Sequence, residues 1–144
     1  MGDGKERDVL KDLVKQLNLD NAVEFTGKVP FKETVSYFNK LNCLVNVSQY
    51  ESFGVSVIEA MACNVPVVVS DTGGLKDIVS NGVTGQCVEP GNIAQTAEAI
   101  EKLIMDKDFA TTSSLKALNS VRELFNWQTN LDQQIAVYGS LVKK

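Results

Sequence analysis

The apolar residues of this chain recur with two different spacings, and the two spacings alternate along the sequence. Recurrence every three or four residues is typical of amphipathic helices, whereas short runs rich in β-branched residues are typical of strands. The first spacing predicts helices over residues 5–18, 31–41, 54–63, 75–80, 93–104, 108–124 and 127–143. The second predicts strands over residues 23–27, 43–47, 66–70 and 85–88. Helices and strands therefore alternate through most of the chain.

The run from Pro66 to Ser70, PVVVS, is the clearest strand. It is almost continuously apolar, which is typical of a strand that is covered on both faces. Because strands and helices alternate through short connections, the pattern predicts an α/β fold with a parallel sheet and helices on both faces. Ligands of such sheets bind at the carboxyl ends of the strands, where helix N-termini point. There is no internal repeat or long linker, and we expect residues 1–144 to form one domain.

Composition narrows the classes of function. The chain is 44% hydrophobic and 22% charged, as in ordinary globular proteins, and its net charge is −4. Because it has no basic cluster, we expect no nucleic-acid partner. No apolar stretch approaches the ~20 residues that a membrane-spanning helix needs. The first residues, MGDGKER, lack the apolar core of a signal peptide, so we expect a cytoplasmic protein.

The absence of histidine limits the available chemistry further. Without it, neither a His-based triad nor the common zinc sites can form. Cys43, Cys63 and Cys87 are widely spaced in apolar contexts, so we interpret them as small buried residues rather than as metal ligands. We expect no metal and no cofactor.

The stretch SQYESFGVSVIEAMAC holds the two carboxylates of most interest. Glu51 lies in a polar turn after a predicted strand, and Glu59 lies about two turns into the helix that follows. The free N–H groups at that helix start, from Phe53, Gly54 and Val55, suit an anionic oxygen such as that of a diphosphate. The two carboxylates could accept hydrogen bonds from sugar or ribose hydroxyls. A nucleotide diphosphate sugar offers both kinds of group.

The residues alone leave plainer alternatives open. Glu51 could merely cap the helix at its positive end, with Glu59 on the surface. Gly73 and Gly74 follow the next predicted strand, where they form either a plain tight turn or a second approach to the same ligand. Residues 2–4, GDG, are only a fragment of a glycine-rich phosphate loop, because a third glycine at the required spacing is missing.

Several segments together resemble the retaining glycosyltransferases of the GT-B fold, in the large group called family 4. The segment from Glu51 to Glu59 is similar to the E-x7-E signature of that family. The resemblance extends to GDGKER, VEFTGKVP, PVVVSDTGGLKDIV and NGVTGQCVEPGN, and to the FNW that precedes the last predicted helix. These motifs follow one another in the family's order and cover most of the chain. The resemblance implies a Rossmann-like parallel sheet.

The resemblance implies a role for each matching residue. Glu51 would bind hydroxyls of the donor sugar, together with backbone groups of Phe53 and Gly54, and Glu59 would bind the ribose hydroxyls. The remaining nucleotide contacts would fall on Val55, Ser56, Lys28, Val29, Gly2 and Gly4. No protein nucleophile is implied, so no catalytic residue is assigned. The leaving diphosphate, stabilised by dipoles and positive charge, would help to deprotonate the acceptor.

The family also implies parts that this sequence does not contain. They are an N-terminal half that binds the acceptor, and the first two strands of the C-terminal half, with an arginine and a lysine for the diphosphate. We therefore expect an N-terminally truncated donor-binding domain that is inactive by itself. Loss of central strands would leave bare sheet edges. We expect either that residues 23–27 pair beside residues 43–47 or that two chains associate.

The function that the resemblance implies is transfer of a sugar, of hexosyl type, from a nucleotide diphosphate sugar to a glycan or lipid-linked acceptor, as in polysaccharide biosynthesis. The parent enzyme could also contact a membrane peripherally, and apolar residues of the last helix could promote self-association. Two alternatives remain. One is a non-catalytic nucleotide- or partner-binding α/β domain, and the other is a further GT-B enzyme such as a glycogen synthase or a sugar epimerase. The presence of both Glu51 and Glu59 favours a donor site.

Overall fold

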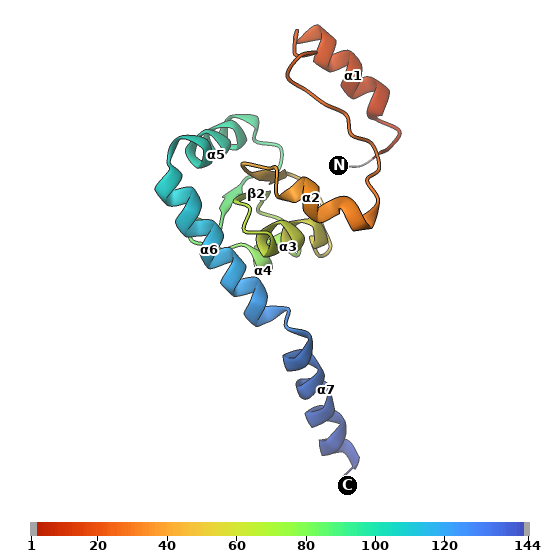
Figure 1. The fold of residues 1–144 in the computed structure, drawn as a ribbon, viewed down its shortest axis with the longest axis vertical. Helices are drawn as coiled ribbons and strands as arrows, with labels where there is room; N and C mark the ends of the chain where they lie inside the picture. The colour runs from red at the N-terminus through yellow and green to blue at the C-terminus, as the bar shows by residue number, and fades with distance from the viewer. Residues whose placement is uncertain (1–2, 143–144) are drawn as a thin grey trace. The chain divides into compact units, whose positions relative to one another are not determined.

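The computed structural model of the chain describes residues 3–142 and groups them into two compact units, one reaching to Tyr37 and the other beginning at Phe38 (Figure 1). The first unit contains α1 (Arg7–Gln16), the 3-10 helix η1 (Phe31–Glu33) and most of α2 (Thr34–Phe38). The predicted helices over residues 5–18 and 31–41 are thus present but shorter. None of residues 3–37 is buried.

The strand predicted over residues 23–27 is wrong, because this segment forms no strand and pairs with no strand of the described chain. The expectation that it would lie beside residues 43–47 is wrong for the same reason. Alternating apolar residues make a strand only where another backbone supplies the ladder hydrogen bonds. The sequence pattern indicates only a preference for extended backbone. Within residues 3–142, this segment has no second strand with which to pair.

The second unit is built around a parallel sheet in the order β1-β2-β3, formed by β1 (Leu44–Asn46), β2 (Val67–Ser70) and β3 (Gln86–Val88). Val68 of β2 lies opposite Val45 of β1 on one side and opposite Gln86 of β3 on the other. All residues of the central strand are buried. The predicted parallel sheet is confirmed.

The remaining helices are α3 (Val55–Ala62), α4 (Leu75–Ile78), α5 (Ile93–Met105), α6 (Lys107–Leu124) and α7 (Trp127–Val142). Three of them begin at a side-chain cap: Asn92 Oδ1 accepts from Gln95 N at 3.1 Å, Asp106 Oδ1 accepts from Phe109 N at 2.9 Å, and Asn126 Oδ1 accepts from Thr129 N at 3.1 Å. Such caps satisfy backbone donors that the first helical turn leaves unpaired. They fix where α5, α6 and α7 start.

Successive residues of β2 point into two different hydrophobic layers. Val67 and Val69 pack with α3, α4 and the second half of α6, including Met61, Leu75 and Ala117. Val68 packs with α5 and the start of α6, in a cluster that includes Val88, Ala99, Leu103 and Ala110. Because side chains alternate along a strand, this division covers both faces of the sheet. The predicted helices on both faces are confirmed.

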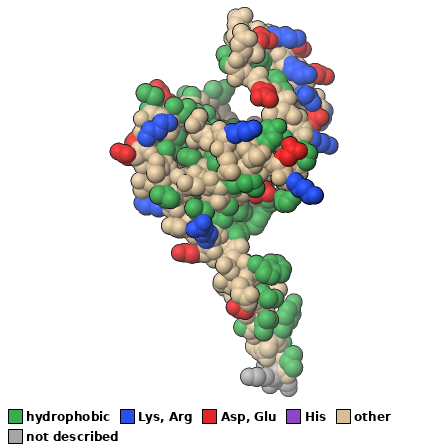
Figure 2. Space-filling model, in the orientation of Figure 1, with side chains coloured by type: hydrophobic (Ala, Val, Ile, Leu, Met, Phe, Trp, Pro, Cys, Tyr) green, Lys and Arg blue, Asp and Glu red, His purple; other side chains and the backbone are tan. Residues whose placement is uncertain are grey.

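The last helix, α7, contributes no residue to either layer. Its apolar side chains are exposed: Trp127 at 79%, Tyr138 at 66% and Leu141 at 65% of their surface. Figure 2 shows hydrophobic side chains along this helix. Within residues 3–142, no helix is both long enough and apolar enough to cross a membrane.

Candidate functional site

Two loops lie side by side at the carboxyl edge of the sheet. The first leads from β1 to α3 and carries Glu51, and the second leads from β2 to α4. Three donors at the end of β2 and in its loop bind three carbonyl groups of the first loop: Ser70 Oγ binds Ser48 O, Thr72 Oγ1 binds Gln49 O at 3.2 Å, and Gly74 N binds Glu51 O at 3.0 Å. These bonds continue the pairing of β1 with β2 beyond the sheet.

Gly54 forms the start of α3 and must be a glycine. It is buried and has φ +86°, a left-handed conformation that side chains with a Cβ rarely adopt. A Cβ at this position would come within 2.7 Å of Leu75 Cδ2 on α4. The sharp turn therefore lets the Glu51 loop enter the helix while it packs directly against α4.

The Glu51 carboxylate folds back onto the turn that precedes α3. Its Oε1 accepts from Gly54 N at 3.2 Å and from Phe53 N at 3.4 Å. Both donors lie before Val55, the first residue of the helix, so the carboxylate lies at the positive end of α3 without a side-chain cap bond to its first turn. The side chain is only partly buried, and Oε2 accepts no hydrogen bond from any described residue. One carboxylate oxygen is therefore used within the chain, and the other is available to a ligand.

Glu59 lies in the middle of α3, between residues that the helix buries. Val57, Ala60 and Met61 are fully covered, whereas Glu59 is partly exposed. Within residues 3–142 its carboxylate makes no hydrogen bond or ion pair. Burial raises the pKa of the neighbouring Cys63 thiol, and the charge of Glu59 raises it further. Glu59 is thus a carboxylate at the edge of an apolar helix, open to a hydroxyl donor.

The first turn of α3 is accessible and tied to the end of β1. Val55 and Ser56 are exposed. Ser56 Oγ accepts from Asn46 Nδ2 at 3.4 Å, and Asn46 Oδ1 accepts from Ser48 Oγ at 2.9 Å. Asn46 carried no specific signal in the sequence, and neither did the hydroxyls of Ser70 and Thr72. Their role depends on how two loops meet, which no spacing within one segment reveals.

Phe53 connects this loop to the end of α6. Half of its surface is exposed, and its ring packs edge-to-face on Phe125 with centroids 5.9 Å apart. Such a contact contributes about 0.5–1.5 kcal/mol beyond the area it buries. Phe125 belongs to the FNW segment, so two of the motifs singled out in the sequence touch each other here.

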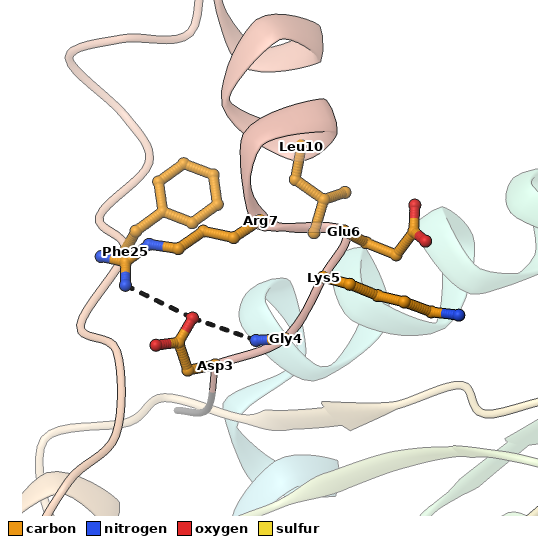
Figure 3. A pocket seen from close by; sticks show the side chains of 7 residues that line it. All are labelled: Asp3, Gly4, Lys5, Glu6, Arg7, Leu10 and Phe25. Carbon is orange, nitrogen blue, oxygen red and sulfur yellow. Dashed lines mark hydrogen bonds and ion pairs between the residues drawn. The ribbon is translucent and has the colours of Figure 1, made fainter.

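The other predicted nucleotide contacts belong to the first unit. Gly2 lies outside the described residues. Gly4 N donates to Asp3 Oδ1 at 3.0 Å, and the same oxygen pairs with Arg7 Nη1 at 3.4 Å (Figure 3). These residues line a pocket of about 340 Å³ with Lys5, Glu6, Leu10 and Phe25. Lys28 is exposed and Val29 partly exposed.

The site can bind and orient a ligand that carries hydroxyls and negative charge. It offers backbone donors at a helix start and two accessible carboxylates, which suit anionic oxygens and hydroxyls respectively. No group of three or more Cys, Asp or Glu side chains within residues 3–142 is placed to hold a metal ion.

Comparison with known proteins reveals a family. The model of the family "Glycosyl transferases group 1" matches residues 1–119. An uncharacterized glycosyltransferase of Methanocaldococcus jannaschii, MJ1607, is 34% identical over 95% of this chain and 35% of its own length. A glycogen synthase of Mycobacterium tuberculosis is 31% identical over 95% of this chain and 33% of its own. The chain thus spans about a third of the length of these relatives.

Solved structures of GT-B glycosyltransferases have the same fold. A sucrose-phosphate synthase of Thermosynechococcus elongatus superposes with a TM-score of 0.87 at 35% identity, covering 97% of this chain and 35% of that one. The Anabaena protein Alr3699/HepE, solved with UDP and glucose, superposes with a TM-score of 0.84 at 30% identity, covering 96% of this chain and 39% of that one. The α/β fold and the resemblance stated from the motifs are confirmed. The chain belongs to the family of group 1 glycosyl transferases.

Proposed function

We propose that this chain binds the donor of a retaining glycosyltransferase, which transfers a hexosyl group from a nucleotide diphosphate sugar to a glycan or lipid-linked acceptor. The observation that carries the proposal is the placement of Glu51 just before α3 and of Glu59 in the second turn of the same helix, which begins at the carboxyl edge of the sheet, where ligands of such sheets bind. The Anabaena relative in this fold has been solved with UDP-glucose.

In this proposal, each group of residues contacts a different part of the ligand. Glu51 Oε2 accepts from hydroxyls of the sugar, and Glu59 accepts from the ribose. Backbone N–H groups of Phe53, Gly54 and Val55 face the diphosphate, where the helix dipole favours negative charge. Glu51 Oε1 now occupies the first two of these donors, so an incoming anion shares or displaces that bond. The proposed nucleotide contacts of Ser56, Lys28, Val29, Gly2 and Gly4 rest on the resemblance to the family alone.

The acceptor and the chemical step belong to the whole protein in this proposal. The chain spans about a third of its relatives, so we place the acceptor site outside it and expect the isolated chain to be inactive. Glycogen and sucrose-phosphate synthases among the similar proteins support a role in polysaccharide biosynthesis. We propose a cytoplasmic enzyme that takes its donor from solution and needs no cofactor.

Calorimetric titration tests the donor site. The chain is titrated with UDP, GDP and ADP and with their glucose derivatives. We expect one base to bind. Glu59→Ala should weaken the nucleotide and the nucleotide sugar alike by about tenfold, and Glu51→Ala should weaken the nucleotide sugar by about tenfold relative to the nucleotide, because each variant loses hydrogen bonds to a charged acceptor. Glu101→Ala, on the exposed side of α5, is the matched control and should bind as the wild type does.

Two results would contradict the proposal. The first is unchanged binding by Glu51→Ala and Glu59→Ala in a chain that binds a nucleotide. The second is unchanged sugar transfer by the same variants in the whole protein. Either result would leave the alternative of a non-catalytic α/β domain, in which Glu51 only binds the turn before α3.

A further inference from the structure

The turn after β2 fits against the Glu51 loop without space for a single added carbon. A Cβ on Gly73 would overlap the carbonyl oxygen of Glu51, and a Cβ on Gly74 would lie 2.6 Å from the carbonyl oxygen of Ser52. Both are backbone atoms, which cannot move aside as the end of a flexible side chain can. The two glycines therefore set how closely the turn approaches the loop.

Hydrogen bonds hold the loop at this distance. Gly74 N donates to the same Glu51 carbonyl that excludes a Cβ on Gly73, and Thr72 Oγ1 donates to Gln49 O. Below them, the fully buried Ser70 donates to Ser48 O. Every second residue from 70 to 74 thus anchors one carbonyl of the loop. The peptide of Glu51 is held from one side, while its carboxylate reaches over the start of α3.

We propose that the turn Thr72–Gly74 is a positioning element for the donor sugar. It sets the Glu51 peptide, and through it the carboxylate, without touching the ligand itself. The inference rests on the proposed function and adds residues that act through Glu51. Because the turn abuts the loop and not the middle of α3, it affects contacts to the sugar and leaves the ribose contact of Glu59 intact.

Gly73→Ala and Gly82→Ala form a matched pair of variants. Both glycines have positive φ, +49° and +70°, so an alanine is strained at either position. Only at Gly73 does the new Cβ meet the Glu51 carbonyl, since nothing lies within 4 Å of it at Gly82. A difference between the two variants therefore reports the contact with the loop and not the strained backbone.

Thr72→Val supplies a second, milder test should Gly73→Ala fold poorly. It removes the hydroxyl that binds Gln49 O and keeps the shape of the side chain. Thr72→Ser restores the hydroxyl and should restore the wild-type behaviour. If Thr72 acted only through packing, Thr72→Val, which keeps the shape of the side chain, would resemble the wild type more closely than Thr72→Ser does.

The first measurement needs no ligand. Backbone amide resonances of Phe53 and Gly54 report their hydrogen bonds to the Glu51 carboxylate. We expect Gly73→Ala and, less strongly, Thr72→Val to shift both resonances, and Gly82→Ala to leave them in place. Unmoved resonances in Gly73→Ala would overturn the inference, whether or not the chain binds a nucleotide.

The second measurement compares Kd for the nucleotide sugar with Kd for the nucleotide alone. In Gly73→Ala we expect the first to rise about tenfold and the second to change less than about twofold, as for loss of a single good hydrogen bond. Equal weakening of both ligands, or of neither, would overturn the link between the turn and the sugar. Failure of the proposed function would give a different result, because Glu51→Ala would then bind both ligands as the wild type does.

Discussion

Among single residues, Glu51 has a geometry that is compatible with both alternatives that the sequence left open. Its Oε1 accepts from Phe53 N and Gly54 N in the turn before α3, and its Oε2 accepts no hydrogen bond from any described residue. A carboxylate has acceptor capacity for such a turn and for a ligand, because each oxygen offers two lone pairs. The bonds to the turn also orient the side chain, which lowers the entropy that a ligand would otherwise have to remove on binding. Glu59 has no such internal partner within the described chain.

The cysteines provide a prediction about pH. Burial raises the pKa of the Cys87 thiol above its ordinary value of 9.0, and the charge of Asp71 raises it further. Because the thiolate is the reactive form, alkylation of Cys87 by iodoacetamide should be slow at pH 7 and half-maximal only above pH 9.0. The folded state favours the neutral thiol, so the free energy of unfolding should fall as pH rises through 9.0, where the unfolded chain ionises first.

Peptide mass spectrometry between about pH 7 and pH 10 measures this rate, and the same chain in urea provides the control thiol. Alkylation of Cys87 at pH 7 as fast in the folded chain as in urea would contradict the prediction.

Among helices and strands, burial separates the elements into two groups. β2 is covered on both faces, and α5 and α6 begin at side-chain caps and bury one side. By contrast, α1 and α7 bury no residue, although both are amphipathic or apolar in sequence. Most of the stability of a helix in a protein comes from packing of its apolar face. The elements of the first group should therefore contribute most of the stability of the fold.

The cap of α5 provides a prediction about stability. Asn92→Ala removes the acceptor for Gln95 N and should lower the free energy of unfolding by about 1 kcal/mol, within the usual range for a lost N-cap. Asn92→Ser keeps an acceptor oxygen at the helix start, without placing a second carboxylate beside Glu89, and should cost much less. Urea denaturation followed by circular dichroism measures both variants through the midpoint. Equal midpoints for the two variants would show that the cap does not stabilise the fold.

At the scale of the whole molecule, the buried apolar side chains within residues 3–142 all lie in the second unit. The two layers around β2 contain them, whereas none of residues 3–37 is buried. Protection from hydrogen exchange follows burial and the density of local packing. Amides of β2 and α3 should therefore exchange slowest, and amides of α1 should exchange within the shortest times measured.

Hydrogen exchange followed by mass spectrometry, at a low and a high protein concentration, checks this expectation. If α1 were as protected as β2 at both concentrations, the expected difference between the units would be wrong. Protection of α1 or α7 only at the higher concentration would instead support the predicted self-association through apolar surfaces.

Much of the second unit could be predicted because its signals are local. The almost entirely apolar composition of Pro66–Ser70 predicts a strand that is buried on both faces. The side chain of Asn92 is of the kind that starts a helix. The segment from Glu51 to Glu59 carries, in its spacing, the resemblance to the family that the comparisons confirm. The failed prediction was the strand over residues 23–27, because a strand exists only with a partner and the pattern of one segment cannot supply it.

The order of residues along the chain is therefore enough to predict the class of fold, the parallel sheet and the helix on which the two carboxylates stand. These properties follow from periodicity, since 2.0- and 3.6-residue repeats place apolar groups on one face of each element. The fit of Gly73 against the Glu51 carbonyl required the folded structure, as did the anchoring hydroxyls of Ser70 and Thr72. Such contacts join loops that are about 20 residues apart, and only the pairing of β1 with β2 brings them within hydrogen-bond distance.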